Sequence, residues 1–341
     1  SVYGGGGGET TIPALGISAF AININGAQGL RFGPDGKLYL ADTTHNRIVS
    51  IALEPDPFFN DLRLTAKVVA GDSSGIASAG YFGDGGPAIN ARLFHPSDVA
   101  FDNAGNMYIA DSDNFRIRRV GPDGIITTIA GNGTEGFSGD GGDALQASLH
   151  APRSIAVDSQ KNVYFSTYDL LGENSRVRRV SPEGIISTAA GTGLKGFSGD
   201  GGPAVSARLS SPHGLAVDSS NILYIADSLN NRIRIVTPTN KIQTIMGTGD
   251  ATDNGTLGVP YSTNLNTPRG VSFRNGTDLL LSEENNRVLM VASAANLPRV
   301  SFESFAPNVL NVIPGGAPQR MEITFSKANF TGPVGMVARN L

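Results

Sequence analysis

Five copies of one strand pattern recur along the chain. Each copy has an apolar strand, a turn, a second strand of the type Leu-Tyr-Ile-Ala-Asp, a short polar loop, and an arginine that leads a third strand. The copies span residues 29–51, 97–120, 154–180, 214–236 and 270–291. Their arginines, which lie at intervals of 69, 60, 56 and 55 residues, are Arg47, Arg116, Arg176, Arg232 and Arg287. A period of this length is typical of a repeat array and not of an ordinary mixed domain.

Each copy predicts one small antiparallel sheet. In the second copy, residues 98–101 and 107–110 read as two short alternating strands, and an Asn-Ala-Gly-Asn turn separates them. A Pro-Asp-Gly turn at 122–124 leads from the third strand into residues 125–130. Tight turns with glycine supply the backbone angles that a hairpin needs. Four such strands form a blade with two apolar faces, and radial stacking of blades, as in a β-propeller, buries these faces.

Three linkers between the copies share a Gly-Asp-Gly-Gly loop, at residues 81–88, 136–144 and 196–204. Together with the blades, these loops resemble the NHL-repeat family of β-propellers, particularly its long bacterial version. The resemblance covers residues 1–293. Two other linkers, 4–28 and 247–268, have similar length but lack the loop sequence.

The ends of the chain bear on the number of blades. The fifth copy stops after its third strand, and the sequence Ser1-Val2-Tyr3-Gly4-Gly5 reads like the fourth strand that elsewhere precedes a linker. We therefore predict an all-β, five-bladed propeller over residues 1–295, whose last blade is closed by the N-terminal strand. A sixth blade, which the family more often has, would have to come from the C-terminal tail.

The tail, residues 296–341, has a different pattern. Its four short alternating segments and its turns resemble the first half of an immunoglobulin-like sandwich. These residues are too few for a whole domain of about 100 residues. The tail is therefore predicted to be either half of an Ig-like domain or an extension that assembles copies by strand addition.

Charge and composition exclude some partners and favour one compartment. The net charge is -4 and the basic residues are scattered, which argues against nucleic acid. No apolar run approaches the roughly 18 residues that a membrane span needs. With no cysteine, disulfides are excluded. Low charge, many glycines and Thr/Asn/Ser-rich loops favour an extracellular or cell-surface protein, and the periplasm also fits.

The repeated acidic and basic residues are the most regular polar feature. The pattern pairs Asp42 with Arg47, Asp111 with Arg116 and Asp227 with Arg232, and Arg176 and Arg287 stand at the same place in the other two copies. In the third copy Thr167, and in the fifth Ser282 or Glu283, stand where the Asp is expected. Arginine offers five donors, for which a carboxylate and backbone carbonyls are natural partners. We interpret these residues as structural ties between loops and blades.

A second set of candidate site residues lies where each inner strand begins, and it consists of Gln28, Ser97, Arg153, His213 and Arg269. Radial symmetry would place these residues near one mouth of a central channel. His95 and His150 lie one or two positions before their prolines. This mouth would suit an anion such as a carboxylate or phosphate. The alternative is a solvated rim, and because the histidines stand at non-equivalent offsets, no metal and no cofactor are predicted.

Three functions remain open from the sequence. The first is a secreted, non-catalytic scaffold that binds a protein or glycan, coupled to self-association through the C-terminal strands. The second is an enzyme of the propeller lyase or lactonase type with its site at the channel mouth, for which no catalytic motif is present. The third is a subunit of an extracellular filament or surface layer.

Overall fold

The computed structural model of the chain describes residues 17–18, 22–55, 62–72, 79–167, 174–252, 262–274, 276–291 and 302–304. The chain divides into two compact units. Unit 1 comprises Ser1–Ile155 with Glu183–Ile186, and unit 2 comprises Ala156–Pro182 with Ser187–Leu341.

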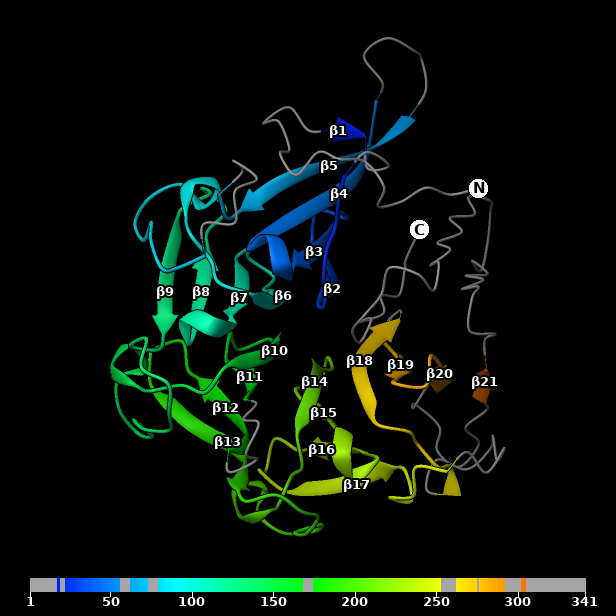
Figure 1. Ribbon diagram of the computed structural model, residues 1–341. Helices are drawn as coiled ribbons and strands as arrows, with labels where there is room; N and C mark the ends of the chain where they lie inside the picture. Colours follow the sequence, from blue (N-terminus) through cyan, green and yellow to red (C-terminus); the bar gives the residue numbers. More distant parts are fainter. Residues whose placement is uncertain are drawn as a thin grey trace. The chain divides into compact units, whose positions relative to one another are not determined.

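The described residues form five antiparallel sheets that follow one another along the chain (Figure 1). The first sheet has the order β1-β5-β4-β3-β2, and its strands are β1 (Ile17–Ser18), β2 (Leu30–Phe32), β3 (Leu38–Asp42), β4 (Arg47–Pro55) and β5 (Leu62–Ala70). The second runs in chain order through β6 (Pro96–Phe101), β7 (Met107–Asp111), β8 (Arg116–Val120) and β9 (Ile126–Ala130). The third contains β10 (Pro152–Val157), β11 (Val163–Thr167), β12 (Ser175–Val180) and β13 (Ile186–Gly193).

The remaining two sheets repeat this arrangement. The fourth contains β14 (Pro212–Val217), β15 (Leu223–Asp227), β16 (Arg232–Val236) and β17 (Ile242–Met246), and the fifth contains β18 (Pro268–Arg274), β19 (Asp278–Glu283), β20 (Val288–Val291) and β21 (Phe302–Ser304). The chain is an all-β, five-bladed β-propeller, as the repeats predict.

Short 3₁₀ turns are the helical elements of the described residues. Three lie between the second and third strands of a blade, namely η1 (Thr43–His45), η3 (Ser112–Asn114) and η6 (Ser228–Asn230). Three others lie in the linkers, namely η2 (Ala88–Asn90), η4 (Ala144–Gln146) and η5 (Ala204–Ser206). Among the described residues, no helix has the length and apolar character that crossing a membrane requires.

The core lies between the faces of successive blades. In unit 1, Val99, Met107 and Ile109 of the second blade are buried with Ala41 and Ile48 of the first. Because successive side chains of a strand point to opposite faces, residues two apart share a face and can face the same neighbour.

A similar core forms in unit 2. Leu215 and Ile225 of the fourth blade pack with Val177 and Ala190 of the third. The repeated alternation of the sequence is therefore what supplies an apolar face to each neighbour.

The outer strand of the last blade departs from the prediction. Its fourth strand is β21 (Phe302–Ser304), which pairs with β20 so that Leu289 lies opposite Ser304. The strand thus follows β20 in the chain, as the fourth strand does in the second, third and fourth blades. Ser1–Gly5, predicted at this position, lie outside the described residues, as do the other residues of the tail that the sequence predicts to be Ig-like.

Candidate functional site

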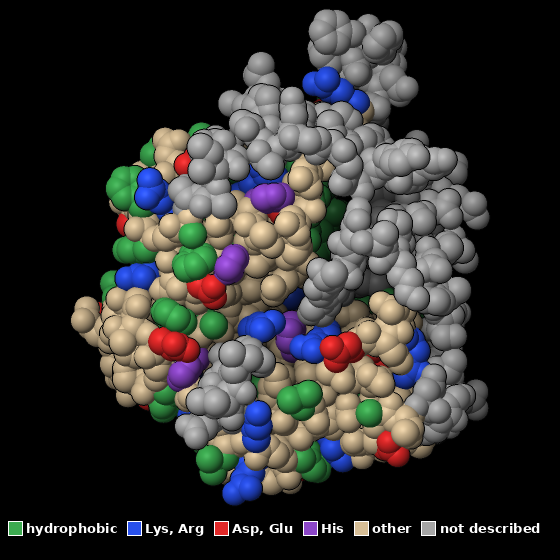
Figure 2. All heavy atoms as spheres, viewed as in Figure 1, with side chains coloured by type: hydrophobic (Ala, Val, Ile, Leu, Met, Phe, Trp, Pro, Cys, Tyr) green, Lys and Arg blue, Asp and Glu red, His purple; other side chains and the backbone are tan. Residues whose placement is uncertain are grey.

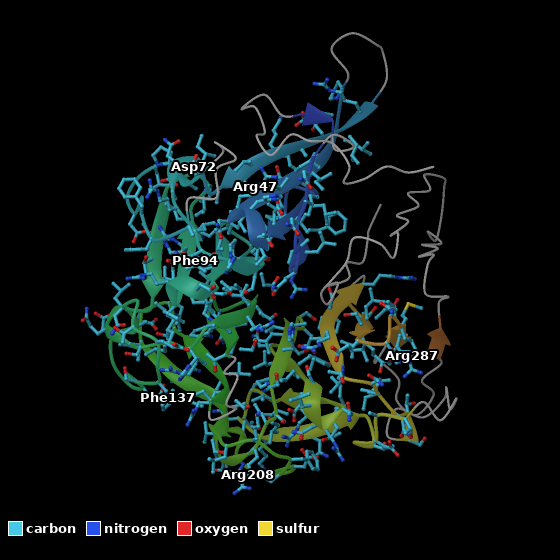
Figure 3. The ribbon with its side chains drawn as sticks, viewed as in Figure 1. Arg47, Asp72, Phe94, Phe137, Arg208 and Arg287 are labelled. Atoms are coloured by element: carbon cyan, nitrogen blue, oxygen red, sulfur yellow. The ribbon has the colours of Figure 1, made fainter. Side chains whose placement is uncertain are left out.

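In the first blade, the carboxylate of Asp42 is fully buried and Arg47 lies directly against it. Arg47 Nε donates to Asp42 Oδ2 at 2.7 Å, and a second guanidinium nitrogen donates to Asn23 O at 2.9 Å. His45 Nδ1 lies 2.9 Å from the same carboxylate oxygen. Figure 3 shows Arg47 among the strands of this blade. In the last blade Arg287 bonds Glu283 and the carbonyl of Asn264.

The second and fourth blades pair their aspartates differently. Asp111 bonds Arg118 at 3.3 Å, and Asp227 lies 3.6 Å from Arg234. The expected pairings with Arg116 and Arg232 are not found, because the arginine two residues further along the strand reaches the buried carboxylate.

The leading arginines of these two blades stack on aromatic rings of the linkers. The guanidinium of Arg116 lies 3.7 Å from the ring centre of Tyr81, and that of Arg232 lies 3.8 Å from the ring centre of Phe197. A cation over an aromatic face at this distance is attractive. A Cβ atom at Gly133 would lie 2.3 Å from the guanidinium of Arg116, so the stack requires glycine on that side.

The second arginine also binds the aspartate of the Gly-Asp-Gly-Gly loop. Arg118 donates to Asp84 Oδ1 at 2.6 Å, and Arg234 donates to Asp200 Oδ1 at 2.6 Å. Asp84 accepts further hydrogen bonds from Thr128 N and the Tyr81 hydroxyl. From the sequence alone, the Asp of the Gly-Asp-Gly-Gly loop is expected to bond the backbone of its own loop. The structure shows instead an ion pair that fastens the linker to the blade.

Backbone hydrogen bonds continue this attachment. Gly85 N donates to Ile126 O at 2.8 Å, Ile126 N donates to Gly86 O at 3.0 Å, and Ala88 N donates to Gly124 O at 2.9 Å. The linker thus runs along β9 and covers part of the outer edge of its blade, which otherwise would carry unpaired backbone groups.

Burial and charge act in opposite directions on these carboxyl groups. Burial tends to raise the pKa of Asp84, but the bonds from Thr128 and the charge of Arg118 outweigh it, so its pKa lies below the ordinary 3.8. Complete burial raises the pKa of Asp111 to about 6, and that of Asp227 likewise to about 6, although hydrogen bonds and the nearby arginines act against the rise.

The inner-strand entrances of unit 1 lie next to one another. A Cβ atom at Gly29 would lie 2.5 Å from Asp98 Cα, which brings Gln28 close to Ser97. Ser97 Oγ lies 2.9 Å from Pro152 O and 2.7 Å from the carbonyl of Arg153. Ser97 is buried and engaged with backbone, whereas Gln28 and Arg153 are partly exposed.

In unit 2, His213 and Arg269 occupy the equivalent positions on neighbouring inner strands. A Cβ atom at Gly214 would lie 2.5 Å from Arg269 O, so β14 and β18 approach closely there. Arg269 donates to Glu284 at 3.0 Å, and its Nε is buried without a hydrogen-bond partner among the described residues.

The histidines near the prolines are each beside a carboxylate. His95 Nδ1 lies 2.6 Å from Asp113 Oδ2, and both side chains are partly exposed. His150 Nδ1 lies 3.6 Å from Glu135 Oε1, which is too far for a hydrogen bond. No cluster of three or more metal-ligating side chains occurs among the described residues.

Sequence similarity identifies the family. A family model described as the teneurin NHL domain matches residues 32–138 and 193–304. The chain belongs to the teneurin NHL domain family. Over 224 aligned residues it is 31% identical to Teneurin-1 of Mus musculus, and the aligned region makes up 62% of this chain and 8% of that protein. It is 27% identical over 283 residues to NHL repeat-containing protein 2 of Homo sapiens, covering 74% of this chain and 37% of that protein.

The NHL propeller therefore corresponds to a minor part of these relatives, between 8% and 37% of their length. Among solved structures, a streptogramin B lyase aligns with 84% of this chain and 70% of that chain, at 16% identity and a TM-score of 0.48.

Two features of this NHL propeller were missed from the sequence. One is the second arginine, Arg118 or Arg234. The sequence could have indicated this arginine, because the Arg-x-Arg pattern occurs in the three blades that follow a Gly-Asp-Gly-Gly loop and is absent from the other two.

The other missed feature is a hydroxyl after the repeat aspartate. Thr43, Ser112 and Ser228 each donate to the carbonyl of the proline that begins the next inner strand, Pro96, Pro152 or Pro268. Its signal is the recurring Asp-Ser or Asp-Thr pair.

Proposed function

We propose that this NHL propeller is a non-catalytic scaffold that binds a protein or glycan partner. The observation that carries the proposal is a set of apolar side chains exposed at the same position of three linkers. Ile89, Leu145 and Val205 each follow the alanine of the Gly-Asp-Gly-Gly loop and are 45%, 44% and 48% exposed. Exposed apolar groups that recur on a fixed framework favour a binding surface over chance.

Aromatic side chains add to each linker surface. Tyr81, Phe137 and Phe197 are also exposed at equivalent positions. Tyr81 and Phe197 are held by arginine stacks, so binding them costs little conformational entropy. Aromatic residues are enriched in protein interfaces. Figure 2 shows hydrophobic side chains at the surface among polar ones on the face in view.

A variant pair tests this proposal. Ile89→Ser, Leu145→Ser and Val205→Ser combined should abolish binding to partners captured on a glycan array or a panel of surface proteins. The matched control, Asn90→Ser with Gln146→Ser, changes exposed polar neighbours in the same turns and should bind as the unaltered chain does. Equal binding by both variants, with folding intact, would contradict the proposal.

One observation supports the enzyme alternative. His213 and Arg269 lie on adjacent inner strands, and the buried Nε of Arg269 makes no hydrogen bond to the part of the chain that the structure describes. A lyase or lactonase of the propeller type would use such residues with a metal ion. Metal analysis decides between the two: a stoichiometric divalent ion that is lost in His213→Ala would favour the enzyme.

We further propose an extracellular or cell-surface location and assembly through the C-terminal strands. The pairing of β21 with β20 places part of the C-terminal segment on the edge of a blade, where strand addition takes place. Native mass measurements over a range of concentrations test assembly. Large particles that persist on dilution would favour the filament or surface-layer alternative.

A further inference from the structure

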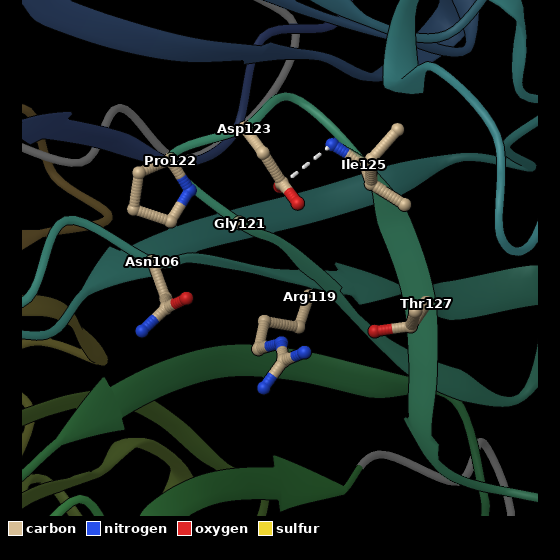
Figure 4. Close-up of a pocket in the computed structure, with 7 residues that line it drawn as sticks. All are labelled: Asn106, Arg119, Gly121, Pro122, Asp123, Ile125 and Thr127. Carbon is tan, nitrogen blue, oxygen red and sulfur yellow. Dashed lines mark hydrogen bonds between the residues drawn. The ribbon is translucent and has the colours of Figure 1, made fainter.

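The second blade contains an open polar pocket, one of whose wall residues, Ile125, pairs with Pro87 of the linker. Its volume is about 360 Å³, and its walls include Asn106, Arg119, Pro122, Asp123, Ile125 and Thr127 (Figure 4). The cavity lies where the turns at 102–106 and 121–125 meet the face of β8 and β9.

Two donors in this cavity have no partner among the described residues. The hydroxyl of Thr127 is buried and makes no hydrogen bond. Arg119 lies directly opposite Thr127 in the β8–β9 register, on the same face, and no hydrogen bond or ion pair joins it to the described part of the chain. Arg119 is exposed, so water can solvate its guanidinium, but the buried hydroxyl of Thr127 calls for a partner, and a ligand supplies one.

No carboxylate of the described residues forms an ion pair with Arg119. The hydroxyl of Tyr108, its other neighbour in the register, donates to Asp102 at 3.1 Å. Asn106 likewise donates to Asp102, and one oxygen of Asp123 accepts from Ile125 N at 3.1 Å. The cavity therefore offers a cation and a free hydroxyl at one wall, with apolar surface from Pro122 and Ile125.

The other blades show that the fold does not require this arrangement. In the fourth blade, Ile235 and Gln243 take the positions of Arg119 and Thr127. In the third, Arg179 stands at the position of Arg119 but hydrogen-bonds the hydroxyl of Tyr164, whereas Arg119 acts on the Tyr108 hydroxyl only through its charge. The unpartnered pair is thus a property of the second blade.

We propose that this cavity binds a carboxylate group. A guanidinium pairs with a carboxylate through charge-assisted hydrogen bonds, and the Thr127 hydroxyl can donate a further bond to the same group. The carboxylate belongs either to a small free acid or to the C-terminus of a peptide. Asp123 weakens binding by repulsion, because its carboxylate faces the same cavity (Figure 4).

The experiment is a titration of the intact chain, followed by NMR shifts of the amides of Gly121, Ile125 and Thr127. The probes are acetate, glutarate, and a tripeptide with a free or an amidated C-terminus. Saturable shifts are expected with the carboxylates and not with the amidated peptide. Stronger binding of the free peptide than of acetate would assign the site to chain ends, and the reverse would assign it to small acids.

Variants separate a built site from general electrostatics. Arg119→Gln should weaken binding about tenfold or more, and Thr127→Val should weaken it by less. Asp123→Asn should tighten it, since it removes a negative charge and keeps the oxygen that accepts from Ile125 N. The matched control is Arg92→Gln, which removes an exposed positive charge in the same unit and should leave affinity unchanged.

Two results would overturn the proposal. One is the absence of saturable shifts with every carboxylate, and the other is an equal loss of affinity in Arg119→Gln and Arg92→Gln. Both outcomes are independent of the linker surface, because none of these variants alters Ile89, Leu145 or Val205. Failure of this site and failure of the scaffold proposal are therefore distinguishable.

Discussion

Replacing Arg118 by methionine tests the energetic role of the buried arginines. The side chain is fully buried and bonds Asp84, Asp111 and the carbonyls of Phe82 and Arg92. Without it, the buried carboxylate of Asp111 keeps its bonds from Phe94 N and Asn114 Nδ2 but loses its cation. Removing one partner of a buried ion pair costs about 3–5 kcal/mol.

The contribution from Asp84 is smaller. Its side chain is 32% exposed, so water can replace much of what the guanidinium supplies. We therefore expect Arg118→Met to lower the free energy of unfolding by about 4 kcal/mol. With an unfolding entropy of about 2.1 cal/mol/K per residue, a domain of about 300 residues would lose roughly 6 °C in Tm.

Urea unfolding at pH 7 and pH 5 provides the assay. Without the positive charge of Arg118, the pKa of Asp111 rises further, so the variant should recover part of its loss at pH 5. The double variant Asp111→Asn/Arg118→Met should be more stable than Arg118→Met at pH 7. Arg119→Met, the exposed neighbour in β8, is the control and should change stability by less than about 0.5 kcal/mol. A loss below about 1 kcal/mol in Arg118→Met, or no rescue by the double variant, would refute the reasoning.

Three further predictions follow from the same contacts. Gly133→Ala should destabilise the chain by about 2 kcal/mol in thermal unfolding, because its Cβ meets the Arg116 guanidinium and its φ is +88°; an unchanged Tm would contradict the stack. Ser228→Ala should cost about 1–3 kcal/mol, because the carbonyl of Pro268 loses its donor, and Ser220→Ala, at an exposed turn, should cost almost nothing. Burial raises the pKa of Asp111 and of Asp227 to about 6 in the folded chain, against 3.8 in the unfolded chain. The stability that these two groups contribute is therefore present below pH 3.8 and is lost as the pH rises through about 6. Asp111→Asn should flatten that part of the stability profile, and an unchanged slope would show that Asp111 does not titrate there.

The repeats predict the fold because blade architecture depends on a few local patterns. Alternating strands, glycine turns and the spacing of the leading arginines suffice for five sheets, which the structure has. The closure of the last blade could not be predicted in the same way. The sequence predicts Ser1–Gly5 as this edge strand and assigns residues 296–341 to the tail, but the strand seen beside β20 is Phe302–Ser304.

The partners of the arginines were harder to predict than their positions. Arg116 and Arg118 share one face of β8, so the sequence cannot say which of them reaches Asp111. The answer depends on the linker, whose Tyr81 takes the first guanidinium and whose Asp84 takes the second. The pocket around Arg119 was also not predicted. What marks it is side-chain donors without hydrogen-bond partners among the described residues, and a sequence does not show hydrogen bonds.

Each Gly-Asp-Gly-Gly linker forms part of its blade and holds exposed apolar side chains in place. Hydrogen exchange measures this attachment at the amides of Gly85 and Ala88, which donate to Ile126 O and Gly124 O. We expect these amides to be protected about as well as those in β8, and to lose much of that protection in Asp84→Asn. If they exchange in the unaltered chain at the rate of an open loop, the linker is not part of the blade.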